Sequence, residues 1–410
     1  MNNTIKLAVA SALLAAASSA SAAGGIVAGD WTLDIGGVVN AYYTSTKVSE
    51  SSSAFTNVGY NSYWAGQNDA LNGTANSASR ANITTGLLPN YLSVSGKTRQ
   101  NDLDVAFTIS INPGTSTVAA GKQSSQQENR QAFLTFGDAS WGSVKLGKDL
   151  GIFASDAILN DMTLLGVGSG AGGLAGNTTT TGRIGTGFMY ADWKAQVAYT
   201  SPNFNGFQFT AGVTQAFNAI GGSVSDTSGQ GGGKEPAFEG KASFTTTVDA
   251  LTAKVWVSGI TQKVEGLTTT GNTSDRAEAF DIGANLNAAG FGLTGYYYDG
   301  KGIGQTVQLY NGFDTTGEAR KSEGYYVQGT YALPGVGTKL GVSYGQSKLK
   351  DNGSSDTLAS DLKDSMWVGG IYHPITKHLN LVAEYSEVKS NYDDESAKGQ
   401  TVSLGAILFF

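Results

Sequence analysis

The chain has 410 residues, including 57 Gly, 6 Pro, 2 His and no Cys, and only 14% of its residues are charged. The absence of Cys excludes disulfides, Cys-ligated zinc and a cysteine nucleophile, and two His argue against a multi-histidine metal site. A count of 26 basic against 33 acidic residues gives a net charge of −7, which argues against a nucleic-acid-binding surface. We therefore expect no catalytic, cofactor or metal site and no nucleic-acid partner.

The N-terminus has the three parts of a secretory signal peptide. Lys6 supplies a positive charge, Leu7 to Ala17 is a mostly apolar run of 11 residues, and Ala20-Ser21-Ala22 is a small-residue cleavage site. A membrane anchor is the alternative interpretation, but a spanning helix needs about 20 apolar residues. The sequence therefore predicts a signal peptide at 1–22 and one mature domain at 23–410.

Beyond residue 30, apolar and small polar residues repeatedly alternate with period 2, which indicates strands with two different faces. In 192–200 the apolar row is Trp193, Ala195, Val197 and Tyr199. We predict sixteen such strands, at 31–44, 90–99, 102–112, 129–137, 141–149, 188–201, 206–217, 237–248, 250–264, 278–288, 290–301, 323–333, 338–349, 364–374, 378–389 and 399–410. No run after Ala22 reaches the about 20 apolar residues of a spanning helix, so a membrane role must come through strands.

The connections between these strands alternate between long and short along the chain. The long ones are 45–89, 113–128, 150–187, 218–236, 265–277, 302–322, 350–363 and 390–398. The short ones include 100–101, 138–140, 202–205 and 334–337. Long loops at one end and tight turns at the other are typical of an outer-membrane barrel, with the turns on the periplasmic side.

A soluble β-sandwich also alternates apolar and polar residues, and it is the alternative fold. However, the second face of the predicted strands is polar, as in Ser93, Ser95, Lys97 and Arg99, and such a face cannot form a dry core. Aromatic residues also gather at the strand ends, where interfacial girdles are expected. Because lipid forbids an unpaired strand edge, we predict an all-β fold, a closed transmembrane antiparallel up-and-down β-barrel of about 16 strands.

Several stretches resemble a known family. Val402, Leu404, Ala406, Leu408 and Phe410 recur at every second position, and this aromatic ending is similar to the assembly signal of Gram-negative outer-membrane barrels, carried here by Phe410, Leu408 and Leu404. The opening strand Trp31-Thr-Leu-Asp-Ile-Gly-Gly-Val-Val-Asn40 resembles the general Gram-negative porin family. So do Asn129-Arg-Gln-Ala-Phe-Leu-Thr-Phe-Gly137 and Trp141-Gly-Ser-Val-Lys-Leu-Gly-Lys148. The likeness covers nearly all of the mature chain.

The resemblance implies a sixteen-stranded barrel, usually a homotrimer, whose third external loop folds into the lumen and narrows the pore. The corresponding connection is 150–187, which begins with a stretch too apolar for a loop lying wholly in external water. A short helix packed inside the barrel would suit Ile152, Phe153, Ile158 and Leu159. The chain lacks the Pro-Glu-Phe-Gly signature of the enteric members, which leaves the path of this loop and its acidic positions open.

The same resemblance implies a constriction in which an acidic inward loop faces a basic wall. The candidate residues are Asp149, Asp156, Asp161, Lys97, Arg99, Arg130 and Lys145. We expect Asp156 and Asp161 to face Lys97 and Arg99 across the narrow passage. Arg130 shares its parity with the outward Ala132 and Leu134, so its inward placement has weaker support. The alternative is that these charges only pair across adjacent strands or reach bulk water.

The function that these observations favour is passive diffusion of small hydrophilic solutes and ions through a water-filled channel, without enzymatic activity. Two alternatives remain, a substrate-selective channel for sugars or organic acids and a non-transport barrel such as an adhesin. The expected location is the outer membrane of a Gram-negative bacterium, reached by export. The expected partners are two further copies of the chain, outer-membrane lipid and lipopolysaccharide, the barrel-assembly machinery and the solutes themselves.

Overall fold

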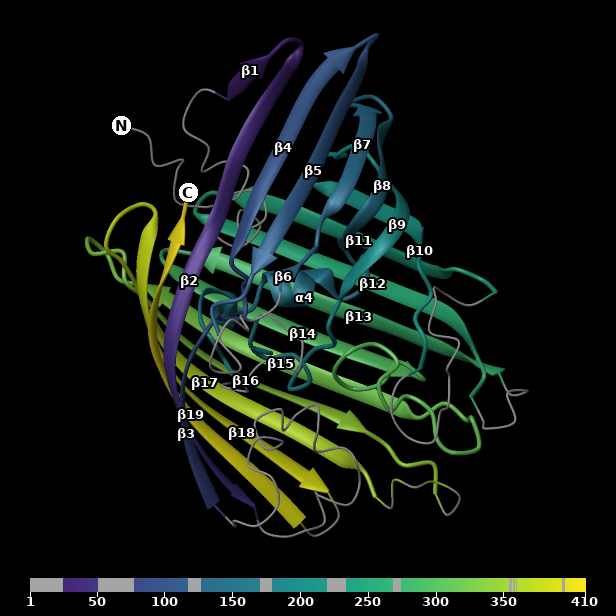
Figure 1. The fold of residues 1–410 in the computed structure, drawn as a ribbon, viewed down its shortest axis with the longest axis vertical. Coiled ribbons are helices and arrows are strands. Elements are labelled where there is room, and N and C mark those ends of the chain that lie inside the picture. Colours follow the sequence, from purple (N-terminus) through teal and green to yellow (C-terminus); the bar gives the residue numbers. More distant parts are fainter. Residues whose placement is uncertain are drawn as a thin grey trace.

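A computed structural model describes residues 25–50, 77–116, 127–169, 179–219, 234–267, 274–353, 356, 358, 360–392 and 395–410. The predicted signal peptide at 1–22 lies outside the described residues. Sixteen antiparallel strands close into one barrel, as predicted from the alternation (Figure 1). In the part of the chain that is described, no helix has the length and apolar character to cross a membrane.

Two of the sixteen wall strands are interrupted and therefore carry two labels each. The first half of the wall is β2 (Trp31–Glu50), β3 (Ser77–Thr84) with β4 (Tyr91–Gln100), β5 (Leu103–Pro113), β6 (Gln127–Glu128) with β7 (Ala132–Asp138), β8 (Gly142–Leu150), β9 (Trp193–Thr200) and β10 (Phe207–Thr214). The second half is β11 (Ala237–Val248), β12 (Leu251–Glu265), β13 (Ser274–Ala288), β14 (Phe291–Lys301), β15 (Lys321–Ala332), β16 (Lys339–Leu349), β17 (Leu362–Pro374), β18 (Leu379–Tyr392) and β19 (Glu395–Phe409). Pairing of β19 with β2 closes the ring, and a short strand β1 (Ile26–Ala28) extends the edge beside the start of β2.

The predicted assignment of alternate residues to the inner and outer faces of the strands is confirmed where the wall is regular. In β9 the side chain of Val197 is 48% exposed on the outer surface, whereas Gln196 is only 6% exposed. In the last strand, Leu404 and Leu408 lie on the exposed outer row. Phe410 follows the end of β19, and its backbone exchanges two hydrogen bonds with Gly37 of β2. The short-turn end carries exposed aromatic side chains, as a girdle requires: Trp141, Phe204, Phe207, Phe291 and Phe410.

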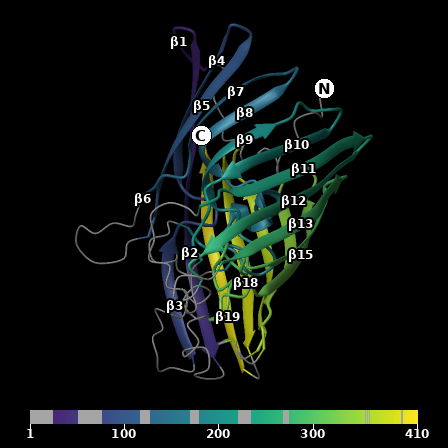
Figure 2. The same cartoon turned by 90° about the vertical axis from the view of Figure 1, so that its right-hand side faces the viewer.

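The short turns lie where they were predicted, but two long connections are wrong in extent. β2 continues to Glu50 and β3 occupies 77–84, so the predicted loop 45–89 is partly strand. The predicted loop 390–398 is a hairpin, because Tyr392 pairs directly with Glu395. The residues in these extensions are mostly polar, so the regular alternation on which the prediction relied is lost there. In Figure 2, β3 lies at one end of the barrel and the turn between β4 and β5 at the other.

The first interruption lies between β3 and β4. Six residues, 85–90, stand opposite only three residues of β2, 39–41, so the extra backbone forms an indentation. The side chain of Asn40 satisfies this backbone, because its amide nitrogen donates to Leu88 O at 2.9 Å and its oxygen accepts from Gly86 N at 2.9 Å. We call residues 85–90 the wall indentation.

The second interruption is a bulge between β6 and β7. Ile109 pairs with Ala132 and Asn112 pairs with Glu128, so two residues of β5 stand opposite the three residues 129–131. A bulge of one extra residue reverses the side-chain alternation locally and re-aims a side chain. The reversal carries Arg130 to the inner face, which simple parity with Ala132 could not predict.

The interior of the barrel is filled by chain that leaves the wall between β8 and β9. Residues 151–169 and 179–192, together named here the inward segment, include the helix α4 (Ser155–Leu159) and the 3₁₀ helix η2 (Met162–Leu165), and Figure 1 shows α4 inside the ring of strands. The predicted sixth strand at 188–201 is therefore too long, since 188–192 belongs to the inward segment and β9 begins at Trp193. The expected helix near Ile158 and Leu159 is confirmed.

Candidate pore and its inward segment

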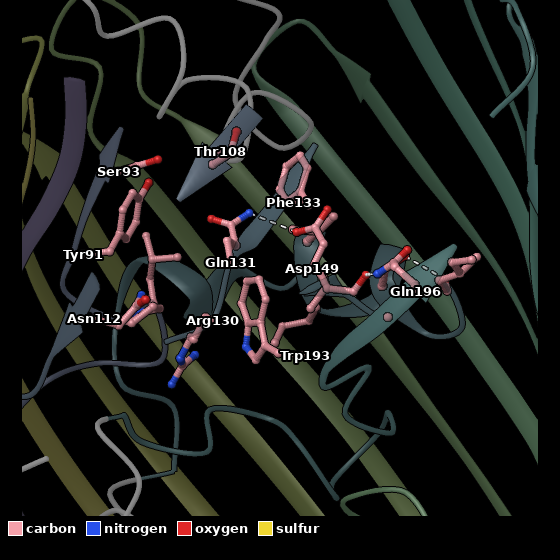
Figure 3. Close-up of a pocket in the computed structure, with 18 of the residues that line it drawn as sticks. Tyr91, Ser93, Thr108, Asn112, Arg130, Gln131, Phe133, Asp149, Trp193 and Gln196 are labelled. Atoms are coloured by element: carbon pink, nitrogen blue, oxygen red, sulfur yellow. Dashed lines mark hydrogen bonds between the residues drawn. The ribbon is translucent and has the colours of Figure 1, made fainter. Parts of the chain in front are cut away.

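A cavity of about 550 Å³ lies between the inward segment and the wall strands from β2 to β11. Its wall side is polar, with Ser93, Thr108, Gln131 and Gln196 among the lining residues (Figure 3). Its other side is made by residues of the inward segment and of the wall indentation. The predicted inward residues Ser93 and Ser95 line this cavity, and Lys97 lines a second hollow at the short-turn end of the barrel.

Glu239 on β11 fastens the beginning of the inward segment. One carboxylate oxygen accepts the backbone N–H groups of Ile152 and Phe153, each at 2.8 Å. The other oxygen accepts from Lys194 Nζ at 2.6 Å and from Thr214 Oγ1 at 2.7 Å. Both charged side chains are completely buried, and a buried charge is stable only when it is paired and fully hydrogen-bonded.

Glu384 on β18 fastens a later part of the segment in the same way. One of its oxygens accepts from Val167 N at 2.7 Å and Gly168 N at 2.8 Å, and the other accepts from Tyr372 OH at 2.6 Å. An ideal Cβ on Gly166 would lie 2.2 Å from a carboxylate oxygen of Glu384. A side chain at 166 would therefore push the Glu384 carboxylate away from these hydrogen bonds.

Gln328 on β15 holds the middle of the segment between these two carboxylates. Its side-chain oxygen accepts from Met162 N at 2.7 Å, and its side-chain nitrogen donates to Asn160 O at 2.9 Å. Tyr326, on the same strand, donates its hydroxyl hydrogen to Ala157 O at 2.9 Å. The inward segment is thus bonded to the second half of the wall, from β11 to β18.

The inward segment is also bonded to β2 and to the wall indentation, since Tyr42 OH donates to Leu165 O at 2.8 Å and Leu87 N donates to Gly166 O at 2.9 Å. The cavity lies between the segment and the first half of the wall.

A second connection, 302–320 between β14 and β15, also folds inward. Its residues Leu309 and Phe313 are buried in the same apolar cluster as Phe188. Gln308 donates to Ala191 O at 3.2 Å, and Thr306 O accepts from the backbone N–H of Tyr190 at 2.9 Å. The connection 302–322 was predicted to be an ordinary external loop. Its apolar residues, such as Leu309 and Phe313, could have indicated an inward path, as the apolar residues of 150–187 did.

Three of the predicted constriction residues, Arg130, Lys145 and Asp149, are brought together at the cavity. Lys145 forms an ion pair with Asp149, which also accepts from Gln131 Nε2 at 3.0 Å (Figure 3). Arg130 donates to Glu128 at 2.6 Å, and its guanidinium lies 5.7 Å from the ring centre of Trp193, within the range of a cation–π contact.

The predicted opposition of Asp156 to Lys97 and Arg99 is wrong. Asp156 instead forms ion pairs with Lys241, at 3.1 Å, and Lys254, on β11 and β12. Burial raises the pKa of Asp156, but the two ammonium groups outweigh it and hold the pKa below its ordinary value. Arg99 lies at the short-turn end, where it pairs with Asp104 and Asp138 at 2.9 Å each. The inward segment enters the barrel near β11, so its first carboxylate, that of Asp156, lies next to the lysines of β11 and β12.

Asp161 also does not face Lys97 or Arg99. It caps η2, accepting from Thr163 N at 3.0 Å, and it is buried. Burial raises the pKa of Asp161, while the nearby Arg183 opposes that rise. Arg183 is itself completely buried, so that burial lowers its pKa, and it donates to Met366 O at 3.1 Å. Arg183 therefore helps to attach the inward segment to β17, whereas Asp161 stabilises η2 within the segment.

Five residues that hold or neutralise the inward segment were not among the predicted site residues: Glu239, Lys241, Lys254, Gln328 and Glu384. All five lie on the inner face of the second half of the wall. Their parity identified them as inward, but the path of the inward segment was needed to show which of them it meets.

The family model described as Gram-negative porin matches residues 8–393 of the chain. Similar solved structures include the outer membrane channel DcaP of Acinetobacter baumannii, with 15% identity, a TM-score of 0.65 and coverage of 94% of this chain and 100% of that one. An anion-selective porin from Comamonas acidovorans has 16% identity, a TM-score of 0.59 and coverage of 93% and 100%. OmpF of Salmonella typhi, in complex with daunomycin, has 16% identity, a TM-score of 0.53 and coverage of 93% and 99%.

A comparison with curated protein sequences gives no match. The structural similarities, at these low identities, support the fold, and barrels of about 16 to 18 strands leave an aqueous channel. The match of the family model over nearly the whole chain establishes the family and its function. The chain belongs to the Gram-negative porin family, and it is an outer-membrane β-barrel channel for passive diffusion.

Proposed function

We propose that small hydrophilic solutes and ions pass between the inward segment and the wall strands β4 to β10, and that the inward segment sets the narrowest point of this route. The observation that carries the proposal is the position of the cavity between the segment and the first half of the wall. Glu239, Gln328 and Glu384 bond it to the second half of the wall, and the cavity lies against the first half.

The chemistry of the cavity supports passage of hydrated solutes. Hydroxyl and amide side chains such as Ser93, Thr108 and Gln131 line its wall side, and these groups can replace part of the hydration of a passing solute. Arg130, Lys145 and Asp149 add charges at the same level, so we assign them to the constriction. Lys97 and Arg99 belong to the mouth at the short-turn end in this proposal.

The test compares two neighbouring positions of β4 in planar bilayers. Ser93 lines the cavity, whereas Leu92 is exposed on the outer surface. Ser93→Trp is expected to lower the single-channel conductance, because the indole occupies the passage. Leu92→Trp, which adds an aromatic group on the lipid side, is expected to leave it unchanged. Equal conductance of both variants and the wild type would place the route elsewhere.

The assembly expected from the family resemblance is also a proposal. We infer that three copies form a homotrimer in contact with outer-membrane lipid and lipopolysaccharide, after insertion by the barrel-assembly machinery and removal of residues 1–22. Membership of the porin family and the exposed aromatic and aliphatic outer surface support this inference. Cross-linking of the detergent-extracted protein tests the number of copies, and a ladder that ends at one copy contradicts the trimer.

A further inference from the structure

Basic side chains outnumber carboxylates beside the entrance of the inward segment. Lys241 and Lys254 share the single carboxylate of Asp156, so the three side chains together carry one excess positive charge. The lysine side chains are 27% and 22% exposed, whereas that of Asp156 is 3% exposed. Lys241 lines the cavity directly. At this cluster the passage therefore meets the ammonium group of Lys241, and that of Lys254 is bonded to the same carboxylate.

Other charged groups around the cavity partly repeat this arrangement. Lys145 is 31% exposed and its partner Asp149 only 12%. In the pair of Arg130 and Glu128 the basic side chain is the less exposed, 6% against 27%, but Glu128 does not line the cavity. Asp34, which does line it, is the remaining negative group on the wall. Asp281, on β13 near Asp156, is completely buried and accepts from Tyr296 OH at 3.1 Å.

The opposite side of the cavity is mostly apolar. The inward segment contributes Ile152, Ile158, Leu159, Leu164 and Ile184, together with the hydroxyl residues Ser155, Thr179 and Thr181, and the wall indentation contributes Leu87, Leu88 and Pro89. Asp156, Asp161 and Asp192, the acidic residues in the described part of the inward segment, do not line the cavity. The passage thus has one mostly polar wall, which includes the ammonium groups of Lys145 and Lys241, and one mostly apolar side.

We propose that this passage selects small organic anions with an apolar body, such as aliphatic or aromatic monocarboxylates. The proposal deepens the proposed route and rests on it. Lys241 and Lys254 attract the carboxylate, since low-dielectric walls focus the field of charges in a narrow water column. The apolar body lies against Leu159 and its neighbours on the inward segment, where it leaves water.

The charge of the passage is tested by reversal potentials in planar bilayers under a potassium chloride gradient at low ionic strength. The wild type is expected to prefer chloride. The double variant Lys241→Gln/Lys254→Gln is expected to shift the reversal potential towards cations. The matched control is Lys263→Gln, because Lys263 lies on the same strand as Lys254 but pairs with Glu265 at 3.4 Å, away from the cavity.

The double variant leaves Asp156 buried without its partners, which can prevent folding. The triple variant Lys241→Gln/Lys254→Gln/Asp156→Asn removes that unpaired charge and is expected to show the same shift towards cations. Asp156→Asn alone is expected to shift the potential towards anions, because both lysines then lack a counter-charge. Unchanged selectivity in the triple variant and in Asp156→Asn overturns the proposal.

The apolar wall is tested by replacing chloride with acetate and then with benzoate. Benzoate is the larger ion, so a purely steric passage favours acetate, whereas the proposal predicts that benzoate permeates at least as well. Leu159→Asn is expected to lower the permeability ratio of benzoate to acetate, and Val336→Asn, on a short turn, is the control. A wild-type preference for acetate overturns this inference while leaving the diffusion route intact. Failure of the wild type to conduct at all contradicts the proposed route itself.

Discussion

Lys194 Nζ lies 2.6 Å from a carboxylate oxygen of Glu239, and both side chains are completely buried inside the barrel. The other oxygen of Glu239 accepts the backbone N–H groups of Ile152 and Phe153. Lys194 follows the end of the inward segment and Ile152 stands near its beginning. One buried carboxylate therefore joins both ends of the inward segment to β11.

Replacing that carboxylate is expected to loosen the inward segment. Glu239→Gln leaves the charge of Lys194 buried without a counter-charge, and breaking a buried pair in this way costs about 3–5 kcal/mol. We expect a lower unfolding temperature by circular dichroism and a noisier single-channel current. Glu387→Gln is the control, because Glu387 pairs with Lys398 in a more exposed position, where an ion pair contributes about 0–1 kcal/mol. Equal effects of the two substitutions would contradict the anchoring role of Glu239.

The orientation of β9 predicts opposite results for two adjacent arginine substitutions. Val197→Arg places a charge on the exposed outer row, where lipid imposes about 2–4 kcal/mol near the midplane, so less folded protein is expected in vesicles. Gln196→Arg faces the interior, next to Leu150 O, and is expected to insert and to change the conductance. Equal insertion of both variants would mean that the assigned faces of β9 are wrong.

The sequence predicts the wall of this barrel well because lipid and water impose opposite requirements on alternate residues. The alternation disappears where both faces of a strand meet water. The predicted ends of β2 and β18 therefore came too early, and the predicted start of β19 came too late. The alternation also fails at the bulge near Arg130, since one extra residue reverses the parity without any change in the apolar pattern.

The constriction was less predictable, for a different physical reason. Parity assigns Lys97 and Arg99 to the inner face correctly, but it does not give their height along the barrel or the path of a loop inside it. Asp156 binds Lys241 and Lys254 because the inward segment enters beside β11 and β12. The apolar residues near Ile158 identified an inward segment, whereas the partners of its carboxylates depend on three-dimensional contacts that the sequence does not encode locally.

The C-terminal aromatic residue is expected to contribute to assembly. The backbone of Phe410 is bonded to Gly37 at the closure of the barrel, and its ring lies at the short-turn end. Phe410→Ala is expected to reduce the amount of heat-modifiable folded barrel in isolated outer membranes. Phe204→Ala, which removes an exposed aromatic ring from a short turn at the same end, is the control. If both variants accumulate equally, Phe410 has no special part in assembly.

Acid is expected to loosen the connection 302–320. Arg320 donates to Phe313 O at 2.9 Å in this connection and forms an ion pair with Asp356. Partial burial raises the pKa of Asp356, but its hydrogen bonds from Arg320 and from backbone N–H groups outweigh it and keep the pKa below its ordinary value. A carboxyl whose folded pKa is depressed stabilises the fold above its unfolded pKa of about 3.9, and this contribution is lost as the pH falls through the folded value.

Hydrogen exchange of the amides in 312–320, corrected for the intrinsic rate at each pH, measures this loss. Protection is expected to be constant near neutral pH and to fall below about pH 4. In Asp356→Asn it is expected to be weaker at neutral pH and less dependent on acid. The same acid-induced loss of protection in the variant would assign it to another group.

The central claim is that the conducting route runs between the inward segment and the first half of the wall, and labelling of single cysteines tests it most directly. The chain has no Cys, so each introduced thiol is unique. Thr108 lines the cavity and its neighbour Ile109 is exposed on the outer surface of β5. A cationic methanethiosulfonate reagent is predicted to reduce the single-channel current of Thr108→Cys and to leave that of Ile109→Cys unchanged. An unchanged current after complete labelling of Thr108→Cys, verified by mass spectrometry, would contradict the account.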